Sequence, residues 1–145
     1  MTGVWVLIGT LAVAGVVGIL WRRRQGRVRT AKGIMLPAEL RELVDPDSPV
    51  TLLQISTTFC APCRHTRILL ADLAEKVDGL RHVDFDVTNH PEVASSLGVL
   101  STPTTLAVDS RGVELMRVGG VPKRDTLLDA LRPHLRHAGT ERDTR

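Results

Sequence analysis

An apolar segment near the N-terminus is long enough to cross a lipid bilayer. Gly3 to Trp21 are nineteen consecutive residues without a charge. As an α-helix they would extend for about 28 Å, close to the thickness of the hydrocarbon core. The two tryptophans of the chain, Trp5 and Trp21, lie near the two ends of this segment, where aromatic residues meet the headgroups. The sequence therefore predicts one transmembrane helix that spans about residues 3–21.

Basic residues follow the apolar segment directly. Residues 22–33 carry six Lys or Arg and no acidic residue, whereas residues 34–145 carry 13 basic and 16 acidic residues. We interpret residues 3–33 as the part of the chain that contacts membrane lipid, with the basic residues at the headgroups. No aromatic residues alternate with these basic residues, so we expect no binding of nucleic acid. Because positive residues that flank a span tend to stay in the cytoplasm, the domain after the helix is predicted to be cytoplasmic.

A cleaved signal peptide is the alternative interpretation of this segment. Such a peptide has a basic region before a shorter apolar run and small residues at a cleavage site after it. Here no basic side chain precedes Gly3 and arginines follow Trp21, so we favour an uncleaved, single-pass anchor. Thr10, Ala14 and Gly18 recur every four positions, a spacing that is compatible with self-association of the helix.

The pattern of apolar residues divides the chain into an anchor with its basic extension (1–33), a domain (34–137) and a polar tail (138–145). Strands are expected at residues 33–36, 50–56, 82–88, 104–108 and 113–118. Helices are expected at 37–44, from the cysteines to about 77, at 91–97 and at 122–137. The apolar face of the helix after the cysteines is expected to comprise Ile68, Leu69, Leu73, Ala74 and Val77. This order predicts an α/β domain with a mixed central sheet and helices on both faces.

Cys60 and Cys63 are the two cysteines of the chain, and they lie between an expected strand and an expected helix. At a helix N-terminus, unpaired N–H groups and the helix dipole stabilise an anion, so the pKa of the Cys60 thiol is expected to fall. Arg64 adds a neighbouring cation, and Pro62 stiffens the first turn without an N–H to lose. Cys63 lies one turn later and can close a disulfide with Cys60. The pair is therefore predicted to be a redox-active dithiol.

Other chemistries fit the cysteine pair less well. A zinc site needs four ligands, and the pair would have to recruit His65, His82 or His90, so we expect no metal. Haem attachment needs a histidine directly after the second cysteine, where Arg64 stands instead. Two inert core cysteines remain an alternative, but their position at a strand–helix junction would then be a coincidence.

Further motifs make residues 34 to about 136 resemble the thioredoxin family. The motif Cys-Ala-Pro-Cys at 60–63 is followed by Asn-His-Pro at 89–91, which resembles the Asn-x-Pro sequence at the start of the family's third helix. Ser-Thr-Pro-Thr at 101–104 resembles the family's loop with a cis-proline, and Gly119-Gly120 resembles its substrate-groove glycine. The resemblance implies a thioredoxin-like fold, here preceded by one transmembrane helix.

The resemblance also implies a role for each matching residue. Cys60 would attack a disulfide of a target protein, and Cys63 would resolve the mixed disulfide and release the reduced target. Pro103 would be cis and face the sulfurs, and the backbone of Thr102 would pair with an extended substrate segment. The implied substrate groove comprises Phe59, Ala61, Pro62, Thr102, Pro103, Gly119 and Gly120. No cofactor is implied besides the redox-active disulfide of Cys60 and Cys63.

Several positions depart from the family's pattern. Gln54 stands where the family usually has a buried Asp that helps to move the proton of the resolving thiol, and an amide cannot take that proton. Asp84 aligns with a Lys near that Asp, so Asp84 or water is expected to serve as the base, with Asp84 and Gln54 as the candidate proton relay. Phe59 replaces the usual Trp, and Ala61 the usual Gly. These changes bear on the reductase efficiency and the redox potential rather than on the exchange chemistry.

Together these features predict a membrane-tethered protein dithiol–disulfide oxidoreductase. Its expected partners are protein disulfides, membrane lipid and, by resemblance, an electron donor of the thioredoxin reductase type. With a cytoplasmic domain it would act as a reductant. Two alternatives stay open: an outward-facing thiol reductase that serves cytochrome maturation, and a redox-inactive or redox-sensing module that holds a partner at the membrane.

Overall fold

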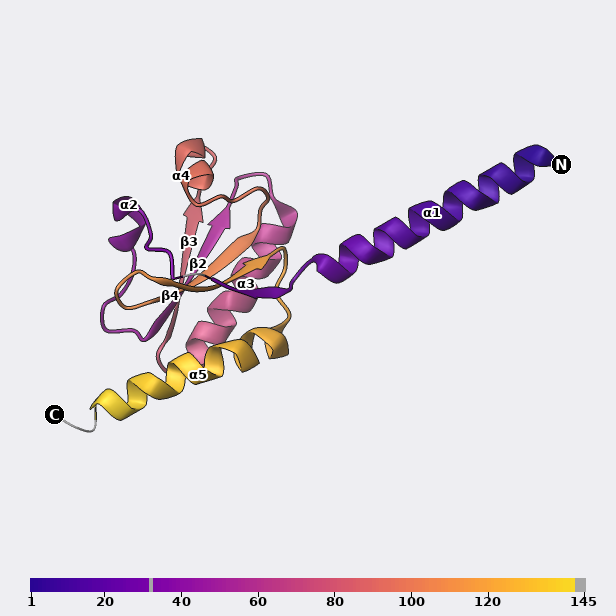
Figure 1. Ribbon diagram of the computed structural model, residues 1–145. Helices are drawn as coiled ribbons and strands as arrows, with labels where there is room; N and C mark the ends of the chain where they lie inside the picture. Colours follow the sequence, from indigo (N-terminus) through magenta and orange to yellow (C-terminus); the bar gives the residue numbers. More distant parts are fainter. Residues whose placement is uncertain (32, 143–145) are drawn as a thin grey trace.

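A computed structural model describes residues 1–31 and 33–142, with side chains described up to Leu135. Its first element, α1 (Thr2–Arg24), is a single helix that extends away from the rest of the chain (Figure 1). No residue of α1 is buried against the protein. A helix that is apolar on all sides is stable only when protein or lipid covers it, and α1 is long and apolar enough to cross a membrane.

The remaining elements form an α/β domain around one mixed sheet. Its strands are β1 (Val28–Thr30), β2 (Val50–Ser56), β3 (Leu80–Asp86), β4 (Thr104–Asp109) and β5 (Glu114–Gly119). They lie in the order β1-β5-β4-β2-β3. β2 is parallel to β3, and the other neighbouring pairs are antiparallel. The predicted mixed sheet is thus confirmed, and β2 lies in the interior of the sheet, between β4 and β3, where its apolar residues are buried on both faces.

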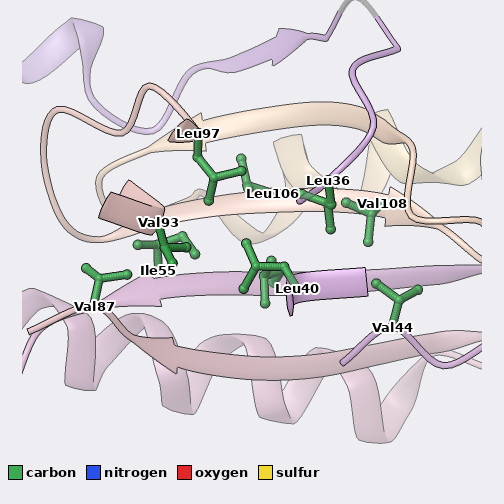
Figure 2. Close-up of a cluster of buried hydrophobic side chains, with 10 residues drawn as sticks. Leu36, Leu40, Val44, Ile55, Val87, Val93, Leu97, Leu106 and Val108 are labelled. Atoms are coloured by element: carbon green, nitrogen blue, oxygen red, sulfur yellow. The ribbon is translucent and has the colours of Figure 1, made fainter. Parts of the chain in front are cut away.

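Helices cover both faces of the sheet, as predicted. They are α2 (Ala38–Arg41), α3 (Ala61–Lys76), α4 (Pro91–Ser96) and α5 (Arg124–Arg142). Leu40 of α2 and Val93 of α4 pack with Leu53 and Leu106 of the sheet in one apolar cluster, which Figure 2 shows in close-up. On the opposite face, a second cluster joins α3 and α5 to the sheet through Leu70, Leu73, Leu127 and Leu131. Each fully buried leucine contributes about 1.5–3 kcal/mol, so the two clusters hold the helices against the two faces of the sheet.

The N-terminal part of the domain differs from the prediction. The regular edge strand is β1 (Val28–Thr30), within the basic extension that was predicted to belong to the anchor (1–33), whereas the expected strand at 33–36 contributes a single bridge between Met35 and Val113. β1 has only one partly buried side chain, Val28. Its backbone pairing with β5, rather than a pattern of apolar residues, makes it a strand.

Two helix boundaries and one helix face also differ. α2 is shorter than the expected 37–44, and α5 continues to Arg142, beyond the expected end at 137. Ile68 was expected on the buried face of α3 but is 66% exposed. The fully buried residues of α3 are Cys63, Thr66, Leu70 and Leu73, which recur every three or four positions. Of the predicted apolar face, Leu69, Leu73 and Val77 do pack into the core, so the prediction is wrong for Ile68.

Candidate active site

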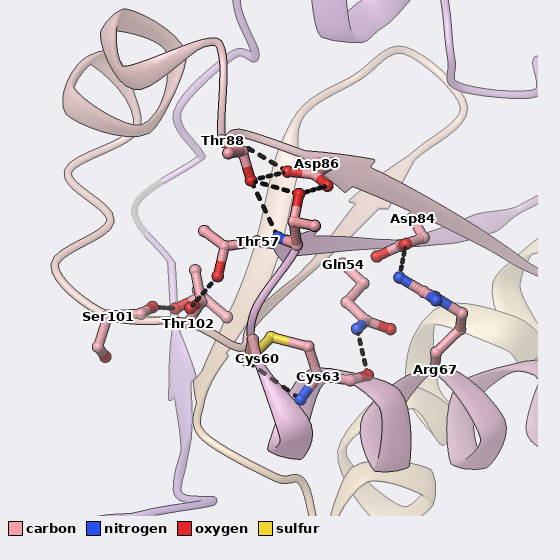
Figure 3. Close-up of a disulfide and its surroundings, with 12 residues drawn as sticks. Gln54, Thr57, Cys60, Cys63, Arg67, Asp84, Asp86, Thr88, Ser101 and Thr102 are labelled. Carbon is pink, nitrogen blue, oxygen red and sulfur yellow. Dashed lines mark hydrogen bonds and ion pairs between the residues drawn. A yellow bond between two sulfur atoms is a disulfide. The ribbon is translucent and has the colours of Figure 1, made fainter.

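Cys60 and Cys63 form a disulfide at the start of α3, directly after the loop that follows β2. The two sulfurs are 2.10 Å apart. Cys60 is the N-cap residue and has an extended backbone, and its Sγ accepts a hydrogen bond of 3.2 Å from the backbone N–H of Cys63 (Figure 3). Pro62 lies in the first turn, where its missing N–H costs no helical hydrogen bond. Cys63 is buried and Cys60 is partly exposed, so Cys60 is the sulfur that a substrate can reach.

The loop before β4 lies beside the cysteine loop. The peptide bond between Thr102 and Pro103 is cis, as the resemblance implied. The hydroxyl groups of Thr57 and Thr102 are 3.3 Å apart, which places this loop against the end of β2. The carbonyl oxygen of Pro103 accepts a hydrogen bond of 2.8 Å from the N–H of Gly120, in the loop after β5. Three loops from the same end of the sheet therefore meet around the disulfide.

The expected groove residues occupy this end of the sheet. An open hollow of about 560 Å³ lies beside Cys60 and is lined by Phe59, Ala61, Arg64, Arg67, Asp86 and the two threonines before Phe59. Phe59 is 98% exposed. Thr102, Pro103 and Gly120 are joined by the contacts just described, whereas the carbonyl of Gly119 is bonded to the N–H of Gly26. The carbonyl of Gly119 thus holds the N-terminal segment, and its place in a substrate groove stays a prediction.

A buried amide lies beneath the disulfide. The side chain of Gln54 is fully buried, and its Nε2 donates a hydrogen bond of 2.8 Å to the carbonyl oxygen of Cys63. Its Oε1 lies 3.1 Å from Nε2 of His82. Because an amide oxygen can only accept, this contact requires the tautomer of His82 that carries its proton on Nε2. The pKa of His82 is lowered overall, mainly because the ring is buried. The negative charge of Asp84 opposes this shift, and the positive charge of Arg67 adds to it.

Asp84 is the register partner of Gln54 on the neighbouring strand. One of its carboxylate oxygens forms an ion pair with Arg67 of α3, whereas the other, Oδ1, is buried and has no hydrogen-bond partner among the described residues. Gln54 contacts the backbone of Cys63 and not its sulfur. The proton relay through Asp84 and Gln54 thus stays a prediction.

Sequence reasoning did not single out three neighbours of this site. His82 was considered only as a metal ligand, although it lies two residues before Asp84 on the same strand and therefore faces the same side of the sheet. Leu100, which precedes the cis-proline loop, is 99% exposed. Asp86 accepts hydrogen bonds from the side chain and backbone of Thr88 and from Thr58, and these bonds lower its pKa. This cluster fastens the cysteine loop to the end of β3.

Among the residues that the structure describes, no group of three or more His, Cys, Asp or Glu side chains is arranged to hold a metal ion. A disulfide at a helix N-terminus, with one accessible and one buried sulfur, defines the class of dithiol–disulfide exchange sites.

Comparison with known proteins agrees with this class. The sequence profile described as Thioredoxin matches residues 34–133. Thioredoxin 1 from Nostoc sp. is 33% identical over 96 residues, which cover 66% of this chain and 88% of that protein. A thioredoxin from Staphylococcus saprophyticus is 32% identical over 89 residues, or 61% of this chain and 85% of that protein.

Solved structures give the same result. A mutant thioredoxin from Halobacterium salinarum has 25% sequence identity and a TM-score of 0.59, over 70% of this chain and 88% of that one. The chain belongs to the thioredoxin family. With its disulfide between cysteines three residues apart, it is a thiol–disulfide oxidoreductase.

Proposed function

We propose that this protein is a membrane-tethered reductant of protein disulfides, with Cys60 as the nucleophile and Cys63 as the resolving thiol. The observation that carries the proposal is the position of the disulfide, at the N-terminus of α3 and beside the cis Thr102–Pro103 loop. Once reduced, the Cys60 thiolate gains from the helix dipole and from the N–H of Cys63, which already points at its sulfur.

The exchange proceeds in two steps. The Cys60 thiolate attacks one sulfur of the target disulfide, a mixed disulfide forms, and the other target sulfur leaves as a thiolate that takes up a proton. The Cys63 thiol then loses its proton and attacks the sulfur of Cys60, which releases the second target thiol. Two electrons pass to the target, and the disulfide of Cys60 and Cys63 is restored. A dithiol or flavin-dependent reductase must reduce it again before the next cycle.

The residues around the disulfide supply the substrate contacts. Phe59, Ala61 and Pro62 are exposed on the cysteine side, and Thr102 offers its backbone to an extended segment of the target. The hollow lined by Arg64 and Arg67 would accept the side chains that flank the target disulfide. For the release step, Asp84 or water would accept the proton of Cys63, since Gln54 cannot.

The proposal that the protein is attached to a membrane rests on α1 and on the arginines at its end. α1 has the length and hydropathy of a membrane span, and Arg22, Arg23 and Arg24 form its last turn. By the preference of basic flanks for the cytoplasm, the domain faces the cytoplasm, where the redox poise favours reduction. Labelling of intact cells with a membrane-impermeant maleimide should leave Cys60 unmodified until the cells are permeabilised. Labelling from outside would overturn this orientation.

Reduction of insulin disulfides tests the exchange chemistry. The full-length chain in detergent, supplied with dithiothreitol, should accelerate insulin reduction, and Cys60→Ser should abolish the acceleration because it removes the attacking sulfur. Cys63→Ser should stop turnover but still form a mixed disulfide. The proposal fails if Cys60→Ser accelerates insulin reduction as much as the unmodified chain does, because Cys60 would then not be the nucleophile. It also fails if the unmodified chain gives no acceleration over dithiothreitol alone, and the protein would then be a module that uses the fold for binding alone.

A further inference from the structure

The pairing of the strands places the end of α1 at the same end of the sheet as the disulfide. β5 is parallel to β2, since both are antiparallel to β4. β1 is antiparallel to β5, so the start of β1 lies at the end of β5. The residues at this end are aligned across the sheet. Ile55 of β2 pairs with Thr104 of β4, and Thr104 pairs with Gly119 of β5. Val28 of β1 pairs with Val118, the residue before Gly119. The chain therefore passes from α1 into the domain beside the cysteine loop.

The connection between α1 and this end of the sheet is short and bonded. Only Gln25 separates the last residue of α1, Arg24, from Gly26, whose N–H donates to the carbonyl of Gly119 at 2.8 Å. Gly26 has a φ of +73°, and a Cβ at this position would lie 2.7 Å from the carbonyl oxygen of Val121. The close contact means that the backbone at residue 26 is held against the loop after β5 rather than free to swing. Figure 1 shows α1 leaving the domain where β1 begins.

A distance limit follows from the length of this connection. If Trp21 marks the edge of the hydrocarbon core, the last turn of α1 adds about 5 Å and two extended residues add at most about 7 Å. Gly119 then lies within roughly 15 Å of the hydrocarbon, whatever the tilt of α1. The headgroup layer on one side of a bilayer is about 5–8 Å thick. Gly119, and with it the Gly120–Pro103 contact at the rim of the groove, therefore lies in or just outside the headgroup layer.

The same end of the sheet exposes large apolar side chains. Phe59 follows the end of β2 and Leu100 precedes the start of β4. They are 98% and 99% exposed, more than any other large apolar side chain that the structure describes after α1. Arg64 is also exposed beside Cys60. Exposed apolar side chains with a neighbouring cation fit the interface between headgroups and water.

From these observations we propose the substrate class: disulfides held within the headgroup layer or just above it, in membrane-proximal segments of other membrane proteins. The proposal rests on the proposed function, because it concerns the reach of the same Cys60. A bilayer beside Gly119 and Gly120 restricts the approach of a folded soluble protein to the groove, whereas a segment that rises from the bilayer enters it directly. The exchange itself is the two-step transfer described above, with two electrons passing from the dithiol to the membrane-proximal disulfide.

The distance dependence of the reaction tests this proposal. The full-length chain is reduced in advance, incorporated into vesicles of phosphatidylcholine and phosphatidylglycerol, and followed through a single turnover. The substrate is a fluorogenic peptide disulfide attached to a lipid through a spacer of either 3 or 15 residues. Both peptides are attached to the membrane, so the ratio of their rates depends on the height of the disulfide above the bilayer and not on membrane attachment itself. Effective concentration falls with about the −3/2 power of spacer length, so the short spacer should react about tenfold faster.

Two insertions of the same sequence provide the matched comparison. Twelve Gly and Ser residues between Gln25 and Gly26 would let the domain move about 20 Å further from the bilayer. This insertion should reduce the tenfold preference for the short-spacer peptide to less than about twofold. The same twelve residues appended after Arg145 should leave the preference unchanged. Equal rates for both spacers with the unmodified chain, or an undiminished preference after the Gln25–Gly26 insertion, would overturn the proposal.

A soluble form of the same peptide tests the exchange reaction independently of the distance between Cys60 and the bilayer. All three chains should reduce it at the same rate, because the insertions leave Cys60 and Cys63 in place. Failure of all three would overturn the exchange reaction itself, and the substrate class with it. Reduction of the soluble peptide without any dependence on spacer length would overturn the substrate class alone.

Discussion

Replacing Gln54 with Asp tests how the buried amide beneath the disulfide shapes the reaction. Asp introduces a carboxyl group next to Cys63 and removes two contacts, the hydrogen bond to the Cys63 carbonyl and the contact with His82. Gln54→Asn is the matched control, since Asn has the size of Asp without the charge. Each lost hydrogen bond costs about 1 kcal/mol, and the missing methylene about 1 kcal/mol more. Both variants should thus lose about 3 kcal/mol of stability when the new side chain is neutral.

The charge distinguishes the two variants. At a fully buried position, desolvation should raise the pKa of the new carboxyl group, and each unit of raised pKa costs a further 1.4 kcal/mol or so when it ionises near neutral pH. Gln54→Asp should therefore be less stable than Gln54→Asn at pH 7 and equally stable at pH 4. Both tryptophans lie in α1, so urea unfolding in detergent is best followed by far-ultraviolet circular dichroism.

Gln54→Asp should also change the kinetics, because a carboxylate near Cys63 can accept its proton. We expect release of the mixed disulfide to accelerate at least about tenfold between pH 6 and 9, near the low end of general-base effects. Gln54→Asn should give no acceleration. If Gln54→Asp and Gln54→Asn released a model mixed disulfide at equal rates across this range, Asp84 or water would already suffice as the base, and the reasoning about Gln54 would be refuted.

Three further predictions concern stability. The pKa of His82 is lowered in the folded state from its usual value of 6.5. As the pH falls below 6.5, the imidazole of His82 is therefore protonated first in the unfolded chain, and the folded state loses stability until the pH reaches the lowered pKa. His82→Gln should flatten this part of the pH dependence, and urea midpoints at pH 7.5 and 5.5 that fall equally in both proteins would contradict it. Leu106→Ala, at a fully buried position, should cost about 3 kcal/mol in urea unfolding, and a loss below about 1 kcal/mol would show that the site is not packed as described. Glu114→Ala leaves the guanidinium of Arg117 without its carboxylate, at a cost of about 3 kcal/mol, whereas an unchanged midpoint would mean that the pair adds nothing.

The central elements of the fold could be predicted because their sequences carry their own signals. The apolar run 50–56 gave β2 with its observed bounds, since a strand buried on both faces needs no partner to be recognised. The helix after the cysteines was predicted because Pro62 marks a first turn. The cysteine pair and the Thr102–Pro103 loop were found by spacing along the chain, and the structure brings them together at one end of the sheet.

Features that depend on distant backbone contacts could not be predicted. β1 has no apolar alternation, and its strand character comes from pairing with β5, almost ninety residues later. The contact of Gln54 with His82 depends on the register between β2 and β3, which places Leu52 opposite His82 and Gln54 opposite Asp84. Ile68 is exposed because it lies outside the stripe of α3 that contains Cys63, Leu70 and Leu73. Composition alone does not determine which stripe is buried.

Trapping of a substrate on the protein is the most direct test of the central claim that Cys60 attacks protein disulfides. The full-length Cys63→Ser variant, reduced and incubated in vesicles with a peptide disulfide, should retain the peptide through a mixed disulfide at Cys60, which mass spectrometry of the digested protein can locate. Cys60→Ser is the matched control, and its buried Cys63 should trap at most a trace. Equal trapping at Cys63 in the control, or no adduct at Cys60 in the Cys63→Ser variant, would contradict the account.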